Sequence, residues 1–356
     1  MHIASRIFAS ATLVVAFALG GGAEAQSNPT DIAARDLVAA AEREDWESVA
    51  LYSQRVNDPL VSAYADWLRL QRRQTKAPFK EIASFIDRHP TWPRQTDMRR
   101  LAEREIDESV SFQMLMDWFE RYPPTTGEGG LAHLDAISRL GNTATIPGLA
   151  RKYWIEKNFE AATETAYLRA YGQHLDRASH EARTDRLIWQ RSHTAARRMV
   201  KRLEAGPAKL ATARIALLRR TNGVDGAIAQ VPDSLRDAPE LWFERLQWRR
   251  KKENNNGARE ILDRVPNPRP RPELWAKEAR ILARRALSEG HYSEAAALVS
   301  NHGLSSGGEF AESEFLAGWL RLSYLAQPNA AEQNFATLYN GVGFPISRAR
   351  GAYWRA

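Results

Sequence analysis

Hydrophobic positions recur at intervals of three and four residues along most of the chain from Asp31 onward. Leu60, Tyr64 and Trp67, for example, fall on one face of a helix, and Pro59 is suited to the first turn of that helix. No stretch alternates hydrophobic and polar residues with the period of two that is typical of a strand. The pattern therefore predicts an all-α protein.

Prolines and glycines divide the amphipathic segments, because proline cannot continue a helix and glycine weakens one. We place breaks at Pro90, Pro93, Pro123-Pro124, Gly129-Gly130 and Gly141. Two polar or proline-rich stretches, residues 251–257 and 266–272, are predicted to connect helices. A domain boundary at the second stretch is the alternative. The segments predicted to be helical include residues 79–88, 94–106, 109–121, 131–140, 145–157 and 309–326.

Short motifs recur along the chain with a period near 34 residues. Residues 85–90 (FIDRHP) resemble residues 118–123 (WFERYP), 33 residues further on, and residues 228–232 (IAQVP) resemble residues 262–266 (LDRVP). A period of this length with two helices per repeat is typical of helical-hairpin arrays. We therefore expect a right-handed α-superhelix, or solenoid, of degenerate tetratricopeptide-like hairpins that occupies residues 26–356 as one domain.

The N-terminus has the features of a secretory signal peptide. Arg6 precedes an apolar run from Ile7 to Leu19, and Ala23-Glu24-Ala25 provides small residues around a cleavage site. We predict that residues 1–25 are removed and that the mature chain is periplasmic; an uncleaved N-terminal anchor is the alternative. No later stretch reaches 18 apolar residues, so we expect no integral membrane segment in the mature chain.

Charge and composition narrow the possible partners. The net charge is +7 and the isoelectric point is about 9.6, which favours an acidic partner or a solvated basic surface. The export signal argues against nucleic acid, so basic runs such as residues 249–252 are interpreted as outer helix faces, with an anionic cell-wall polymer as the weaker alternative. The 11 tryptophans are interpreted as core residues, with stacking on sugar or peptide left open for a few. The absence of cysteine excludes disulfides and thiolate zinc sites.

The most specific sequence motifs lie near the C-terminus. Residues 311–320 (AESEFLAGWL), 335–339 (FATLY) and 345–354 (PISRARGAYW) together resemble the long helical region of the soluble lytic murein transglycosylases of Gram-negative bacteria. The resemblance implies a helical superhelix followed by a lysozyme-like domain. In that family this domain cleaves the bond between N-acetylmuramic acid and N-acetylglucosamine and leaves a 1,6-anhydro product.

The resemblance also implies a catalytic glutamate that is followed by serine and, later, by Gly-Leu-Met-Gln. Outside the C-terminal passage, the Glu-Ser pairs of the mature chain are Glu47-Ser48 and Glu108-Ser109, and neither precedes such a run. Glu108 is expected to open a repeat helix, with Ser109 or Ser111 as its cap. His174 and His180 are six residues apart, which suits neither a helical metal site nor a triad. We therefore assign no catalytic, cofactor-binding or metal-binding residue, and no cofactor.

These observations lead to two hypotheses. The first is that the chain is the superhelical, peptidoglycan-associated region of a periplasmic lytic transglycosylase that stops before the catalytic domain, so that it binds glycan strands and is inactive alone. Gly351 would then allow close helix contact, while Tyr353 and Trp354 would lack the helix against which they pack. The alternative is a free-standing periplasmic repeat scaffold that binds other cell-wall proteins. A complete enzyme is disfavoured because no acid–base pair is evident.

Overall fold

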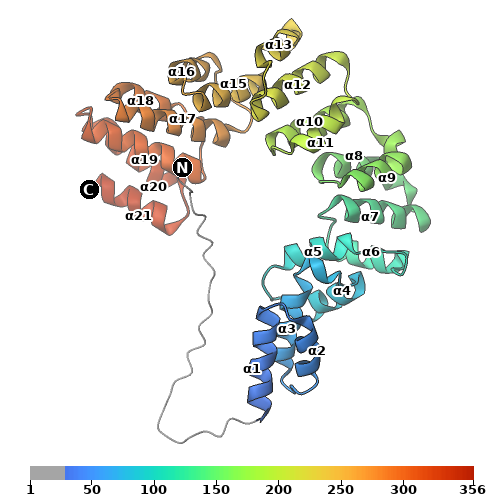
Figure 1. The fold of residues 1–356 in the computed structure, drawn as a ribbon. Coiled ribbons are helices and arrows are strands. Elements are labelled where there is room, and N and C mark those ends of the chain that lie inside the picture. Colours follow the sequence, from blue (N-terminus) through green and yellow to red (C-terminus); the bar gives the residue numbers. More distant parts are fainter. Residues whose placement is uncertain (1–28) are drawn as a thin grey trace, which may run out of the picture. The chain divides into compact units, whose positions relative to one another are not determined.

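The computed structural model describes residues 29–356, which form two compact units, residues 29–110 and residues 111–356 (Figure 1). Within the described residues all regular elements are helices and there is no strand. The prediction of an all-α protein is confirmed. No helix in this part of the chain is both long enough and apolar enough to cross a membrane. The predicted signal peptide, residues 1–25, lies outside the described residues.

The first unit contains five α-helices. Leu37 and Ala40 of the first helix pack against Val49 of the second and Ala65 of the third, and together they form a small aliphatic core. Asp58 caps the third helix, because its side chain accepts hydrogen bonds from the next backbone N–H groups. The helices are α1 (Pro29–Glu42), α2 (Trp46–Ser53), α3 (Pro59–Leu70), α4 (Phe79–Arg88) and α5 (Gln95–Arg104).

The second unit contains the remaining α-helices. They are α6 (Phe112–Arg121), α7 (Gly127–Arg139), α8 (Ile146–Glu156), α9 (Ala161–Tyr171), α10 (Arg177–Trp189), α11 (His193–Val200), α12 (Ala205–Arg219), α13 (Val224–Ala229), α14 (Asp233–Arg236), α15 (Pro239–Lys251), α16 (Asn255–Arg264), α17 (Pro272–Ser288), α18 (Tyr292–Ser300), α19 (Gly308–Ser323), α20 (Pro328–Gly341) and α21 (Pro345–Arg355).

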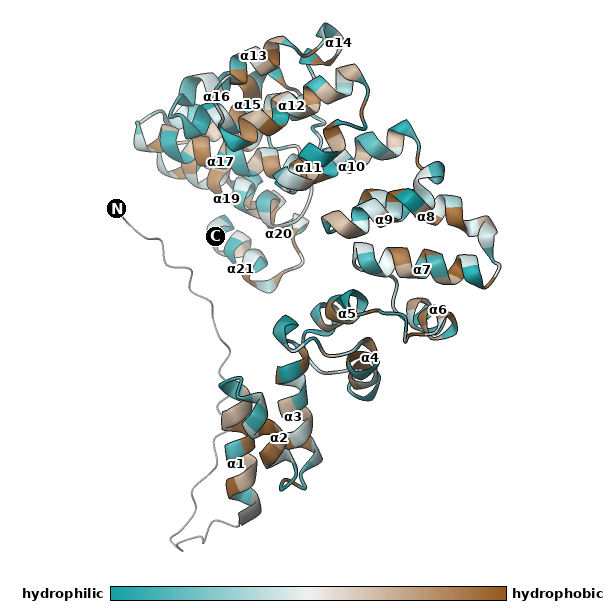
Figure 2. Ribbon diagram, turned by 45° about the vertical axis from the view of Figure 1, so that its right-hand side comes forward, coloured by the Kyte–Doolittle hydropathy of each residue, from teal (hydrophilic) through white to brown (hydrophobic). Residues whose placement is uncertain are grey.

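Helices of the second unit pack in sequence order. Consecutive helices pair, as in α15 with α16, α17 with α18 and α19 with α20, and alternate helices also touch, so that α12 contacts α15, α15 contacts α17, and α17 contacts α19. The run Pro-Glu-Leu-Trp begins both α15 and α17, 33 residues apart. Hydrophobic and hydrophilic residues are distributed around these helices so that each one can bury a face against its neighbours (Figure 2).

Several predicted boundaries agree with the structure and others do not. Helix α4 has the predicted limits and α3 begins at the predicted Pro59; α21 likewise begins at a proline, Pro345. Gly129-Gly130, however, lies inside α7 rather than at a break. The neighbouring chain explains Gly130 and also Gly127, because a Cβ at Gly130 would lie 3.3 Å from the Tyr153 ring and one at Gly127 would lie 2.7 Å from the Asn158 carbonyl oxygen. Close approach of the chain, not the end of a helix, requires glycine here.

The C-terminal passage forms three packed helices, α19 to α21. A Cβ at Gly351 would lie 3.0 Å from the backbone nitrogen of Tyr339 in α20, which confirms the predicted close contact. The Trp354 ring lies 5.9 Å from that of Phe315 and 5.8 Å from that of Phe335, so the expectation that Trp354 lacks a packing partner is wrong. Tyr353, in contrast, is 75% exposed.

One buried ion cluster stabilises the middle of the second unit. The Arg183 guanidinium is fully buried and donates to Glu164 Oε2 at 3.1 Å and to the carbonyl oxygen of Trp154 at 2.7 Å. Arg198 donates two further hydrogen bonds to the same carboxylate, both at 3.0 Å. Burial raises the pKa of Glu164, but the two arginines outweigh this effect and hold its pKa below the usual value. The cluster therefore keeps its charges and joins α9, α10 and α11.

Candidate functional site

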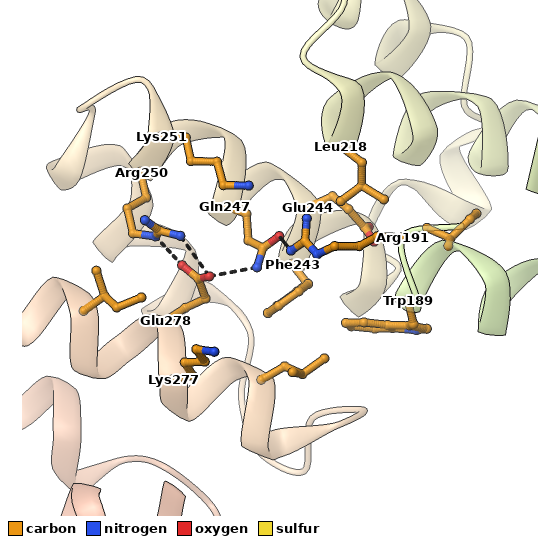
Figure 3. Close-up of a pocket in the computed structure, with 13 residues that line it drawn as sticks. Trp189, Arg191, Leu218, Phe243, Glu244, Gln247, Arg250, Lys251, Lys277 and Glu278 are labelled. Carbon is orange, nitrogen blue, oxygen red and sulfur yellow. Dashed lines mark hydrogen bonds and ion pairs between the residues drawn. The ribbon is translucent and has the colours of Figure 1, made fainter. Parts of the chain in front are cut away.

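A cavity of about 290 Å³ lies within the second unit, where α10, α12, α15 and α17 come together (Figure 3). Its size is close to the lower end of the range for cavities that bind small ligands. The apolar side chains that line it are Ile188, Trp189, Leu218, Phe243, Leu274 and Ile281, and the polar ones are Arg191, Glu244, Gln247, Arg250, Lys251, Lys277 and Glu278.

A chain of hydrogen bonds orders the polar wall. Arg191 Nη2 donates to Gln247 Oε1 at 2.6 Å, and Gln247 Nε2 donates to Glu278 Oε1 at 2.8 Å. Arg250 donates through Nη2 to Glu278 Oε1 at 3.0 Å and through Nε to the other carboxylate oxygen. Gln247 and Glu278 are buried, and the dashed lines of Figure 3 connect all four side chains. Both oxygens of the Glu278 carboxylate therefore already accept hydrogen bonds from side chains of the protein.

The second carboxylate of the cavity is also occupied. Arg214 donates through Nε and Nη2 to the two Glu244 oxygens at 3.0 and 3.2 Å, and through Nη1 to Asp185 at 2.7 Å. Burial raises the pKa of Glu244 to about 7, although Arg214 opposes this effect. A raised pKa is one mark of a general acid. Here both carboxylate oxygens already accept from Arg214 and the side chain is 1% exposed, so Glu244 cannot give a proton to a ligand.

Cations are in excess around the cavity. Four basic side chains line it against two carboxylates, and one of these carboxylates, Glu244, is already paired with Arg214. Within the described part of the chain, neither Lys251 nor Lys277 has a hydrogen-bond or ion-pair partner. Burial, together with the charges of Arg191, Arg220 and Arg250, lowers the pKa of the Lys251 ammonium. The site is therefore short of negative charge.

An aromatic wall completes the cavity. The ring of Trp189 lies 4.9 Å from that of Phe243, and both line the space beside the basic side chains. The guanidinium of Arg271 lies 5.1 Å from the Trp189 ring centre, which adds a further cation at this end. The arrangement can hold an anionic group at the lysines while its carbon atoms pack against the aromatic and aliphatic wall.

The residues weighed from the sequence lie elsewhere. Glu108 is exposed in the turn before α6 rather than in a helix, and Ser111 caps α6 by accepting from the Met114 N–H. Glu47 is exposed in α2. His180 is half-buried and accepts a hydrogen bond from the Trp154 indole at 3.2 Å. None of these residues lines the cavity between α10, α12, α15 and α17.

The hydrophobic pattern of the chain does not predict the cavity, because it places the basic run at residues 249–252 on an outer helix face. Arg250 instead binds the buried Glu278, and Lys251 lines the cavity. A usable signal was the Pro-Glu-Leu-Trp run, which begins both α15 and α17. Across residues 29–356 no group of three or more histidine, aspartate or glutamate side chains could hold a metal ion.

No family model matches this chain, and no curated protein matches it either.

Proposed function

We propose that the chain is the superhelical, peptidoglycan-binding region of a periplasmic protein of the lytic murein transglycosylase type, and that it binds the cell-wall polymer without cutting it. The observation that carries the proposal is the cationic cavity, whose free lysines suit the carboxylates of peptidoglycan stems. The only two carboxylates that line it already accept hydrogen bonds from arginine, so the cavity itself offers no acid for cleavage.

Two further observations support this reading. Alternate contacts between helices, from α12 through α15 and α17 to α19, are those expected of stacked hairpins in a right-handed tetratricopeptide-like superhelix. The passage that resembles the transglycosylases forms one closely packed group of helices, in which small residues such as Gly318 and Gly351 allow the contacts. The predicted signal peptide adds the compartment in which the polymer lies.

Co-sedimentation with purified peptidoglycan sacculi tests the proposal. We expect the full chain to sediment with sacculi at low ionic strength and to be released as salt is added, because the contacts are ionic. We also expect no soluble 1,6-anhydro-muropeptides. Failure to sediment at low salt refutes the binding role, and release of anhydro products above a blank refutes the non-catalytic one.

A second candidate is a scaffold for other cell-wall proteins. It is favoured by the apolar side chains that α21 and the residue before it expose, since Phe344 is 65%, Ile346 73% and Tyr353 75% exposed. Replacing Ile346 by lysine separates the two functions. If the variant still binds sacculi but loses a protein that co-purifies with the unmodified chain, the scaffold role is favoured. If sacculus binding and co-purification are both unchanged, the polymer-binding role is favoured.

A further inference from the structure

We infer that the cavity between α10, α12, α15 and α17 recognises the carboxylate-bearing peptide stem of the polymer rather than its neutral sugar backbone, with Lys251 and Lys277 holding the carboxylate. This inference rests on the proposed function for the identity of the polymer. The charge preference itself follows from the cavity alone.

The two lysines are the groups left for a ligand. Glu278 is consumed by Arg250 and Gln247, and Gln247 in turn accepts from Arg191, so these side chains form a fixed wall. In the view of Figure 3, Lys251 and Lys277 lie on either side of the Glu278 carboxylate, and neither is drawn to it by a hydrogen bond. Lys277 is exposed and Lys251 is half-buried, so both ammonium groups reach water, and an entering carboxylate can replace that water with charge-assisted hydrogen bonds.

The surroundings of Lys251 also favour an anion. Burial is the main cause that lowers the pKa of the Lys251 ammonium; the charges of Arg191, Arg220 and Arg250 lower it further, and Glu278 opposes them. A carboxylate that enters the cavity relieves this repulsion as well as gaining its own contacts. The positive charge of Lys251 is therefore more stable in the complex than in the free protein.

The apolar part of the lining suits a short peptide. Phe243, Leu274 and Ile281 provide carbon surface beside the cations, against which the methyl and methylene groups of a peptide stem can pack. A neutral oligosaccharide offers many hydroxyl groups but no charge, so it would leave both ammonium groups unpaired while they lose water. Losing water without gaining a partner opposes binding.

The test combines a change in the ligand with a change in the protein. Calorimetric titration of the full chain would use N-acetylmuramyl-L-alanyl-D-glutamate, its fully amidated neutral form, and the neutral tetrasaccharide of N-acetylglucosamine. The protein variants are K251M/K277M and, as a control with the same loss of charge, K201M/K209M. Lys201 and Lys209 are exposed and neither lines this cavity. Circular dichroism and thermal unfolding establish that each variant is folded.

We expect the acid to bind at least about tenfold more tightly than its neutral amide, which is the smallest effect typical of a charged hydrogen bond. K251M/K277M should abolish this preference, whereas K201M/K209M should keep it, because the coupling belongs to groups in contact. The inference is overturned if the acid and its amide bind alike, if the tetrasaccharide binds as tightly as the acid, if both double variants weaken binding equally, or if the acid does not bind.

The same variants separate this inference from the proposed function. If K251M/K277M still sediments with sacculi as the unmodified chain does, and the acid shows no preference, the cavity assignment is wrong while the peptidoglycan role stands. If the acid binds in a lysine-dependent way but sacculi are not bound, the cavity assignment stands and the peptidoglycan role is wrong.

Discussion

Replacing Gly351 by alanine tests whether α21 is held against α20 by direct contact between their backbones. The added Cβ would lie 3.0 Å from the nitrogen and 3.1 Å from the Cα of Tyr339, and 3.2 Å from the carbonyl oxygen of Phe335. All three atoms belong to the backbone of α20, so no flexible side chain can move aside. The helix α21 must shift by a few tenths of an ångström, and the contacts of Trp354 and Arg350 move with it.

Two opposing effects set the size of the change. Crowding of a well-packed contact costs about 1–3 kcal/mol. Alanine in place of glycine inside a helix stabilises the helix by about 1 kcal/mol. The net expectation for Gly351→Ala is a loss of about 0–2 kcal/mol from the docking of α21, because the first effect exceeds or equals the second.

Hydrogen exchange of a peptide that covers residues 345–355 measures this docking. A loss of about 1.4 kcal/mol lowers protection tenfold. The control is Ala352→Gly, at an exposed position of the same helix, which changes helix propensity by about 1 kcal/mol without touching α20. If protection in Gly351→Ala instead rises by about the amount by which Ala352→Gly lowers it, only helix propensity is acting. The backbone contact is then not what holds α21.

Three other predictions follow from the described contacts and from the sequence. Gly148→Ala in α8, where a new Cβ meets nothing within 4 Å, should raise the free energy of unfolding by about 0.5–1 kcal/mol in urea titrations; a loss would contradict the open space. Glu164→Gln should destabilise the second unit by about 3 kcal/mol near neutral pH, because it leaves Arg183 and Arg198 without their carboxylate. Because the folded pKa of Glu164 is lowered, its contribution to stability is present above the unfolded value of 4.5 and is lost as pH falls through the folded pKa. The variant should therefore lose less stability than the unmodified chain as pH falls below about 5. Equal losses would show that the pair does not govern acid unfolding. N-terminal sequencing of the exported protein should begin at Gln26, and a start at Met1 would refute the signal peptide.

Helix limits were predictable wherever a local signal fixes them. Pro59 and Pro345 begin α3 and α21 because proline lacks the N–H that the first turn does not use. Gly129-Gly130 misled the sequence analysis because glycine has two uses, ending a helix and allowing close approach. Only the position of Tyr153, more than twenty residues away along the chain, decides between them.

The polar residues of the site could not be predicted from local sequence signals. Helix α15 buries Glu244 and Gln247 together with Leu241, Trp242 and Phe243, so polar and apolar residues share its inner faces. Amphipathic pattern alone assigns charged residues to the outside. Their burial becomes intelligible only when Arg214 and Glu278 are supplied by α12 and α17, on either side in the chain.

Ion pairs between α12, α15 and α17 use both carboxylates that line the cavity. Helices α15 and α17 begin with the same Pro-Glu-Leu-Trp run, yet their inner faces carry different charges, Glu244 on the first and Glu278 on the second. Each carboxylate binds an arginine, Glu244 taking Arg214 from the preceding helix α12 and Glu278 taking Arg250 from α15. Successive hairpins are thus joined by ion pairs that leave no carboxylate for Lys251 and Lys277. Two cations without an ion-pair partner therefore remain at the cavity, which is why we place the anionic ligand at these two lysines rather than at the arginines that bind Glu244 and Glu278.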